Sequence, residues 1–269
     1  SYVSEEGGRF RVNVFRKDSG VGAVFRSIPS HVPTLDSLSL PPVVRNLCDH
    51  HQGMILVTGS TGTGKSTTLA AMIDHLNSTR KLNIISLEDP IEFVHRSKQS
   101  QVIQREYGTH VPSFAEGVRA AMREDPDVIL VGEMRDPETM RIAVQAAGIG
   151  HLVLTTLHTT DVAAAVGRIA DNFPPERQPT IRQDLSMGLS AVLIQSLLPR
   201  IGGGRVPASE LLVVGYGARQ HIRKNALQHL NQEITITRKA GSYTLEEELA
   251  SLVKRNLVSR EDAQLRASH

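Results

Sequence analysis

The chain of 269 residues is 40% hydrophobic and 22% charged, which is ordinary for a soluble globular protein with one well-buried core. One cysteine, Cys48, excludes an intrachain disulfide and a cysteine-based zinc site, and strand-length apolar runs exclude direct membrane insertion, which takes ~20 apolar residues. A formal net charge of +2, with six Phe, four Tyr and no Trp, argues against a nucleic-acid partner.

Two strands are expected near the N-terminus, followed by a linker. Residues 9–15 (RFRVNVF) alternate apolar with polar side chains, and residues 23–28 indicate a second strand after a turn marked by Gly20 and Gly22. Because two strands cannot bury a core alone, we expect this piece to pack against a larger unit. Several prolines then predict a stiff linker over residues 30–42.

Strand and helix patterns alternate from residue 54 onward. We expect strands over residues 54–58, 82–87, 128–131 and 152–156, and helices over residues 65–76, 114–122 and 137–147. This alternation predicts parallel strands joined by right-handed crossovers, and hence a three-layer α/β domain. After about residue 199 the pattern changes to a loop, a strand over residues 211–214 and mostly helix, with a capping box at Thr244 and Glu247.

The segment GSTGTGKS at residues 59–66 fits the phosphate-loop pattern, with a strand before it and a helix after it. Its glycines allow successive backbone N–H groups to turn inward around phosphates. Lys65 would neutralise the β- and γ-phosphates, and the Ser66 hydroxyl would bind Mg²⁺. A glycine-rich turn with an accidental lysine is the alternative. We therefore predict ATP and Mg²⁺ binding at Gly59, Ser60, Thr61, Gly62, Thr63, Gly64, Lys65, Ser66 and Thr67.

Acidic residues follow two predicted strands, at the sheet edge where open parallel sheets bind ligands. The first strand is followed by Glu88, Asp89 and Glu92, and the second by Glu133. A motor needs a carboxylate to orient or activate water, and we expect Glu133 to serve this chemistry. Glu88 and Asp89 could instead only cap a turn before Pro90.

Two histidines bracket the strand over residues 152–157. At ~3.3 Å per residue their imidazoles would lie roughly 20 Å apart, so they cannot both contact one γ-phosphate. His158 lies at the carboxyl end, with the phosphates, and is the expected nucleotide sensor or transition-state donor. His151 could serve a subunit interface or only cap the strand.

Several long motifs, in this order, resemble those of the secretion ATPase superfamily of type II secretion and type IV pili, and most of all its pilus-retraction (twitching-motility, PilT) branch. They are RFRVNVF, GAVFRSIP, GSTGTGKSTTLAAM, SLEDPIEFVH, REDPDVILVGEMRD, GHLVLTTLHT and IGGGRVPASELL. The resemblance covers nearly the whole chain. It implies a RecA-like ATPase core at residues 43–200, after the last part of a PAS-like N-terminal domain at residues 1–29 and before a mainly helical segment at residues 201–269.

The resemblance also implies roles for single residues. Glu92 would be the general base that polarises the attacking water, and Glu133 would be the Walker B carboxylate acting through Mg²⁺. Arg11 and Arg26 would close over the γ-phosphate, and His158 matches the second histidine of the family's His box. We expect the N-terminal strands to pack against the phosphate-loop domain of an adjacent subunit, with both arginines near that nucleotide.

The same resemblance implies a cytoplasmic homo-hexameric motor that retracts type IV pili at the cytoplasmic face of the inner membrane. Its partners would be the inner-membrane pilus platform protein and, as a second candidate, a paralogous motor ATPase. Three alternatives are a secretion or pilus-extension ATPase of the same superfamily, an accessory ring protein with dispensable ATPase activity, and a RecA-like nucleic-acid translocase. Relatives in the first group often carry a tetracysteine zinc insertion, which Cys48 alone cannot form.

Residues 216–224 (YGARQHIRK) only partly match the C-terminal helix of retraction motors. Within them Arg219 and Arg223 are four residues apart, so a helix would place both on one face, where they could bind an acidic partner. A solvated basic face is the alternative.

Overall fold

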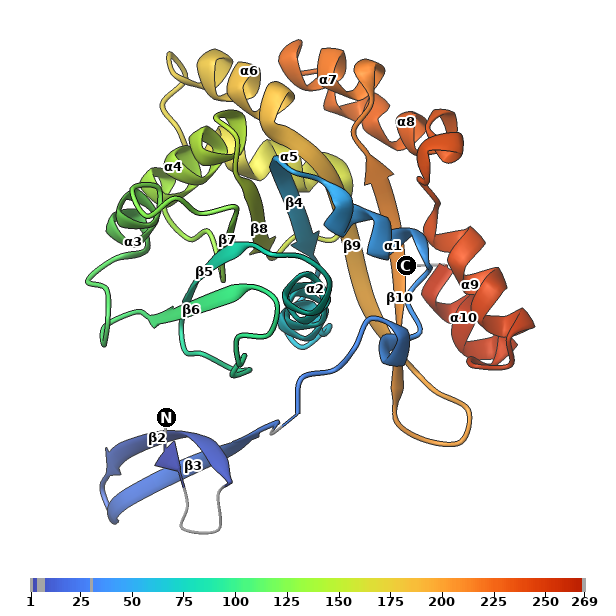
Figure 1. Cartoon of the computed structure of the whole chain (residues 1–269). Coiled ribbons are helices and arrows are strands. Elements are labelled where there is room, and N and C mark those ends of the chain that lie inside the picture. Colours follow the sequence, from blue (N-terminus) through green and yellow to red (C-terminus); the bar gives the residue numbers. More distant parts are fainter. Residues whose placement is uncertain (1, 4–7, 30, 268–269) are drawn as a thin grey trace.

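The main body is a seven-stranded sheet in the strand order β10-β9-β4-β8-β7-β5-β6 (Figure 1). The computed structural model describes residues 2–3, 8–29 and 31–267. The strands are β4 (Gly53–Thr58), β5 (Asn83–Glu88), β6 (Gln101–Glu106), β7 (Val128–Val131), β8 (Leu152–Leu157), β9 (Leu189–Pro199) and β10 (Arg205–Val213). Neighbouring strands from β9 to β6 pair in parallel, and β10 pairs antiparallel with β9 at the edge. The predicted α/β fold with a parallel sheet is confirmed.

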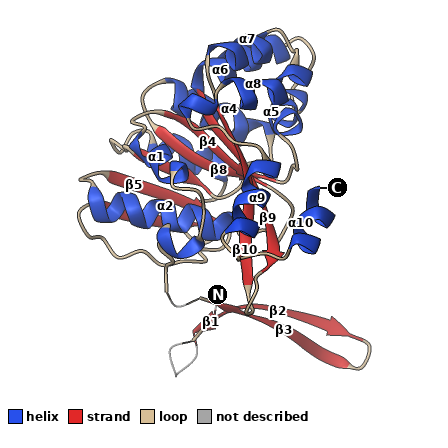
Figure 2. Ribbon diagram, turned by 90° about the vertical axis from the view of Figure 1, so that its right-hand side faces the viewer, coloured by secondary structure: helices blue, strands red, loops and turns tan. Residues whose placement is uncertain are grey.

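Helices cover both faces of this sheet (Figure 2). They are α1 (Val43–Asn46), α2 (Lys65–Thr79), α3 (Phe114–Ala121), α4 (Pro137–Gly148), α5 (Val162–Asp171), α6 (Gln178–Gly188), α7 (Tyr216–Arg223), α8 (Leu230–Ile236), α9 (Leu245–Lys254) and α10 (Arg260–Ala267). Side chains of Ser113, Asp136, Asp161 and Thr244 accept hydrogen bonds from the first turns of α3, α4, α5 and α9, which fixes where those helices begin. In the described part of the chain, no helix combines the length and apolarity needed to cross a bilayer.

Strand β4 is buried on both sides, and its side chains divide between two cores. Met54 and Leu56 join the cluster under α3 to α8, whereas Ile55 and Val57 join the cluster under α1 and α2. This division follows from the alternation of side chains along a strand. A strand covered on both faces must be apolar throughout, which explains the unbroken hydrophobic run before the phosphate loop.

A small separate sheet contains the two predicted N-terminal strands, as β2 (Arg9–Lys17) and β3 (Gly20–Ile28), together with β1 (Tyr2–Val3). It lies below the main body in Figure 1, and Arg9 of β2 contacts the loop after β5 of that body. Apolar side chains such as Val21 and Phe25 are 70% and 61% exposed in the single chain. The hairpin therefore buries little by itself, as expected for two strands.

The turn of this hairpin lies at residues 18–19, rather than at the two glycines that marked it in the sequence. Gly22 instead lies within β3, opposite Phe15 of β2. A Cβ atom at Gly22 would lie 2.7 Å from the Phe15 ring, so the glycine makes room for this ring.

The C-terminal part of the sheet differs from the sequence prediction. Strand β10 pairs with β9 along its whole length, so the predicted boundary between residues 200 and 201 falls inside a hairpin of the main sheet. Helices α5 and α6 and strands β6 and β9 were also absent from the predicted elements. The helical segment begins only at α7.

Arg219 on α7 is tied to the end of α6. Its guanidinium donates hydrogen bonds to the carbonyl oxygens of Ser186 and Met187, at 2.6 and 2.7 Å. These carbonyls belong to the last turn of α6, where helix ends lack intrahelical donors and carry partial negative charge. The expected pair of partner-binding arginines is therefore reduced to Arg223, which is exposed.

We expect Arg219→Ala to lower the melting temperature by roughly 4 °C, because it removes charged hydrogen bonds to two helix-end carbonyls. Thermal unfolding followed by circular dichroism measures this, with Arg223→Ala as the matched control. Equal melting temperatures for the two variants would contradict a capping role for Arg219.

Candidate functional site

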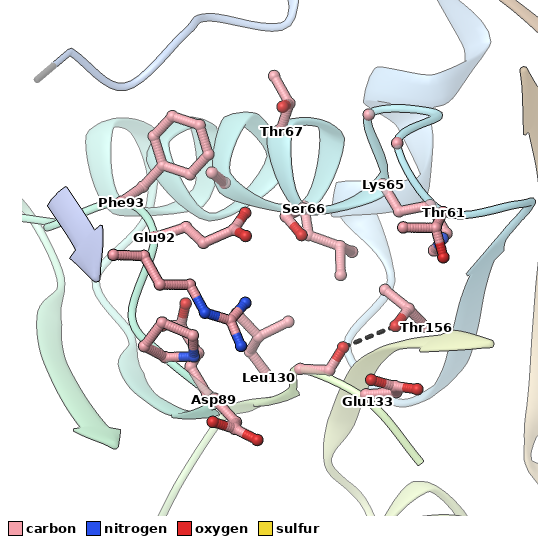
Figure 3. A pocket seen from close by; sticks show the side chains of 18 of the residues that line it. Thr61, Lys65, Ser66, Thr67, Asp89, Glu92, Phe93, Leu130, Glu133 and Thr156 are labelled. Carbon is pink, nitrogen blue, oxygen red and sulfur yellow. Dashed lines mark hydrogen bonds between the residues drawn. The ribbon is translucent and has the colours of Figure 1, made fainter. Parts of the chain in front are cut away.

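A cavity of about 520 Å³ opens at the carboxyl ends of the parallel strands (Figure 3). Its wall combines the phosphate loop, the loop after β5, the ends of β7 and β8, and two residues of the small N-terminal sheet. Open parallel sheets bind ligands at this edge. The structure thus brings into one cavity most of the side chains that the sequence singled out: Arg11, Arg26, Thr61, Gly62, Gly64, Lys65, Ser66, Thr67, Glu92, Glu133 and His158. Gly59, Ser60 and Thr63 belong to the same loop.

The phosphate loop leads directly from β4 into α2. Gly64 adopts a φ of 86° as the residue before the helix, a left-handed conformation that favours glycine. Helix α2 begins at Lys65, so its first N–H groups and its positive dipole end face the cavity. This arrangement suits an anion such as a phosphate.

Lys65 carries its charge into the loop from a largely buried position, with 7% of the residue exposed. The ammonium group donates hydrogen bonds to the carbonyl oxygens of Gly59 and Ser60, at 2.8 and 2.9 Å. Burial lowers the pKa of Lys65, and the negative charge of Glu133 opposes that shift.

Glu133 lies just beyond the end of β7 and is held by two basic side chains. Arg135 donates to Glu133 Oε2 at 2.7 Å, and His158 Nε2 lies 3.0 Å from Glu133 Oε1. Burial by itself would raise the pKa of Glu133, but the hydrogen bond and charge of Arg135, helped by His158, lower it. The carboxylate is therefore ionised at neutral pH.

His158 lies between the lysine and the glutamate. Its Nδ1 atom is 3.4 Å from Lys65 Nζ, while Nε2 faces Glu133. An ammonium group can only donate and a carboxylate can only accept, so Nδ1 faces a donor at Lys65 and Nε2 faces an acceptor at Glu133. The imidazole then links the cation and the anion of the site.

His151 occupies the other end of β8, as the spacing predicted. Its Nδ1 atom lies 2.7 Å from the carbonyl oxygen of Pro126, in the segment that precedes β7. Two roles were left open for His151, a subunit interface and capping of the strand, and this contact corresponds to capping.

The last residue of β5 and the acidic loop after it supply three carboxylates with different surroundings. Glu92 points into the cavity toward Ser66 (Figure 3). Asp89 forms an ion pair with Arg135 at 3.2 Å. Burial raises the pKa of Glu88, whose carboxylate accepts hydrogen bonds from Ser86 and Gln104 on β5 and β6. Glu88 therefore links the end of β5 to β6, while Glu92 is the carboxylate directed at the phosphate-loop helix.

Arg135 is a cavity residue that sequence reasoning missed. It bridges the loop after β5 and the end of β7, because the same guanidinium contacts both Asp89 and Glu133. The sequence feature that could have identified Arg135 as a cavity residue is its position two residues after Glu133, just beyond the apolar strand β7.

Arg11 and Arg26 are directly opposite each other on β2 and β3, and both line the cavity. Like charges directly opposite each other on a hairpin repel, so such a pair suits an anion placed between or before them. Arg9, which lies on β2 with Arg11, donates a hydrogen bond of 3.0 Å to the carbonyl oxygen of Ile91, the residue before Glu92. In this single chain both arginines line the cavity of their own subunit, and the expectation that they lie at an adjacent subunit's nucleotide stays a prediction.

The donor set of the cavity fits Mg²⁺ bound together with a nucleotide. Ser66 offers a hydroxyl and Glu133 an ionised carboxylate in the same cavity. Mg²⁺ typically uses one or two protein oxygens and takes its other ligands from phosphates and water. Among the described residues no group of three or more His, Cys, Asp or Glu side chains could hold a metal, so a site here would rely on the nucleotide's oxygens.

Comparisons with known proteins agree with this geometry. A family model described as type II/IV secretion system protein matches residues 9–235. The chain is 48% identical to the type IV pilus retractation ATPase PilT of Pseudomonas aeruginosa, over 96% of this chain and 75% of that protein. It is also 48% identical to a twitching motility protein of Neisseria gonorrhoeae, over 97% of this chain and 70% of that protein. A crystal structure of the pilus retraction motor PilT with bound ADP superposes with a TM-score of 0.88 at 47% identity, covering 97% of this chain and 75% of that one.

Proposed function

The chain belongs to the type II/IV secretion system protein family, and we propose that it is an ATPase motor subunit that drives the retraction of type IV pili. One observation carries the proposal: a phosphate loop, two carboxylates, a histidine and two arginines meet in a single cavity. Phosphoryl transfer requires this combination, since negative charge must be neutralised from several directions while water is activated.

In the proposed reaction the phosphate loop and Lys65 hold the β- and γ-phosphates of ATP. Glu92 accepts a proton from the water that attacks the γ-phosphorus, and ADP leaves as the bond to the β-phosphate oxygen breaks. Ser66 and Glu133 would hold Mg²⁺, which when bound would neutralise charge on the phosphate oxygens. His158 hydrogen-bonds Glu133 and keeps that carboxylate oriented.

We expect the N-terminal sheet to move relative to the phosphate loop, because Arg11 and Arg26 lie on that separate sheet. The γ-phosphate attracts both arginines, so ATP favours a closed position of the N-terminal sheet over the phosphate loop. Hydrolysis and phosphate release remove that differential contact, and the sheet is free to move. The coupling depends on the segment between β3 and α1, of which Leu35 and Leu40 are packed into the core of the main body.

The proposed assembly is a homo-hexamer. The apolar side chains exposed on the N-terminal hairpin, including Val14, Val21, Val24 and Phe25, support packing against another subunit. The motor would act in the cytoplasm at the inner membrane, on the pilus platform protein, and a paralogous motor ATPase could share its work.

The purified chain should hydrolyse ATP at a rate that single- or double-stranded DNA changes by less than about twofold, because its 30 basic residues are nearly balanced by 28 acidic ones. Release of inorganic phosphate measures the rate. Strong stimulation by DNA would favour a nucleic-acid translocase, and absence of hydrolysis would favour an accessory ring protein.

The direction of force is tested in cells. Deleting the gene should leave cells with excess pili and no twitching motility, since extension continues without retraction. Electron microscopy counts the pili. Bald cells would identify an extension motor instead.

A further inference from the structure

Gln195 is a buried amide placed directly behind the phosphate loop. It lies on β9, next to the residue that pairs with Thr58 at the end of β4, and only 3% of it is exposed. Its side chain spans two parts of the nucleotide site. Nε2 donates to the carbonyl oxygen of Thr63 at 2.7 Å, and Oε1 accepts from the hydroxyl of Thr68 at 2.7 Å.

The orientation of this amide is fixed by chemistry. A backbone carbonyl can only accept a hydrogen bond, so the atom facing Thr63 must be the nitrogen. The oxygen then faces the Thr68 hydroxyl, which donates to it. One side chain therefore ties the loop to the first turn of α2 and leaves both of its ends satisfied.

The bond to Thr63 also sets the direction of a loop N–H group. The carbonyl of Thr63 and the N–H of Gly64 belong to one planar trans peptide, in which they point in opposite directions. Because Gln195 draws the carbonyl toward β9, the Gly64 N–H is directed away from β9. Gly64 lines the cavity that contains Lys65, and Gln195 does not. The tether thus aims a backbone donor at the place where a phosphate would bind.

Two glycines of the phosphate loop, Gly59 and Gly64, lie close to Gln195. A Cβ atom at Gly59 would lie 2.2 Å from the backbone oxygen of Gln195, and one at Gly64 would lie 3.0 Å from its Nε2. The loop is therefore packed closely on Gln195, and a side chain at either glycine would push it away from β9.

We propose that Gln195 is a positioning residue of the nucleotide site, which holds the peptide between Thr63 and Gly64 so that its N–H group donates to a phosphate of the nucleotide. The inference rests on the proposed nucleotide-binding function of the same cavity. Because a phosphate is held in the ground state and in the transition state alike, the contribution falls mainly on nucleotide affinity.

Gln195→Met keeps the length of the side chain and removes both hydrogen bonds, whereas Gln195→Glu keeps its shape and places an acceptor against the Thr63 carbonyl. Each should raise the Kd for ADP, measured by calorimetry, and the KM for ATP by about tenfold, while kcat changes by less than about threefold. The matched control is Ser209→Ala. Ser209 faces Gln195 across the β9–β10 pair, is fully buried and hydrogen-bonds the Tyr243 hydroxyl, away from the loop.

Ser209→Ala and Gln195→Met should both lower the melting temperature, but only the Gln195 variants should weaken ADP binding. Wild-type ADP affinity in Gln195→Met and Gln195→Glu, or equal weakening in Ser209→Ala, would overturn the proposal. A wild-type chain that binds ADP without hydrolysing ATP would reject the proposed motor function, while the ADP comparison would still decide the role of Gln195.

Discussion

Lys65→Ala should abolish ATP hydrolysis, with kcat/KM for ATP falling by ~10³-fold or more, because the phosphate loop loses the cation at its centre. The ammonium group lies inside the loop, against the carbonyl oxygens of Gly59 and Ser60. Around it the cavity wall carries the carboxyl groups of Glu88, Asp89, Glu92 and Glu133. Without Lys65, these carboxylates would repel the phosphates, and much less positive charge would lie nearby to offset that repulsion.

Steady-state phosphate release measures this loss, and Lys98→Ala is the matched control. Lys98 also forms an ion pair, with Asp74 at 2.7 Å, but its side chain is 47% exposed and lies outside the cavity. Its removal should leave turnover within about twofold of wild type, because exposed ion pairs contribute little. Wild-type turnover in Lys65→Ala would refute the whole functional proposal.

The phosphate loop and its flanking elements could be predicted because their signals are local. An apolar strand, a glycine frame and a helix follow one another within one short segment, and each signal is set by backbone geometry. The placement of His151 and His158 at opposite ends of one strand was predictable for the same reason, since the strand itself separates them. Each histidine is found at the predicted end of β8.

Other features of the fold and the site could not be predicted, because they depend on contacts between residues far apart in the sequence. Strand β9 is an apolar run of strand and helix formers, and periodicity alone does not distinguish a buried strand from a buried helix. Gln195 acts on Thr63 from 132 positions away, and Arg135 reaches Asp89 across 46 positions. Such pairs become visible only when the strand order is known.

The arginines illustrate a further limit. Strand alternation predicted that Arg11 and Arg26 each lie on one face of a hairpin, but their register depended on the turn. The turn at residues 18–19 brings Arg11 opposite Arg26, and a turn shifted by one residue would have separated them.

Glu92→Gln and Glu133→Gln should each lower kcat by ~10²-fold or more while leaving the Kd for ADP within about threefold of wild type. Glutamine keeps the size of the side chain but can neither accept a proton from water nor carry a negative charge. Neither carboxylate is expected to contact the phosphates directly, so nucleotide binding should survive. Glu116→Gln, on the exposed first turn of α3, is the control for loss of one surface charge.

The two variants should differ in how ADP binding responds to Mg²⁺. Glu133 is held ionised by Arg135 and His158 in the cavity that Ser66 also lines, so Glu133→Gln should reduce the gain in ADP affinity that Mg²⁺ provides. Glu92, which points into the cavity from the loop after β5, should leave that gain intact when it is replaced. Calorimetric titration of ADP with Mg²⁺ and with EDTA separates the two roles. If either variant lost ADP affinity as severely as Lys65→Ala, its carboxylate would be holding the nucleotide rather than serving the chemistry.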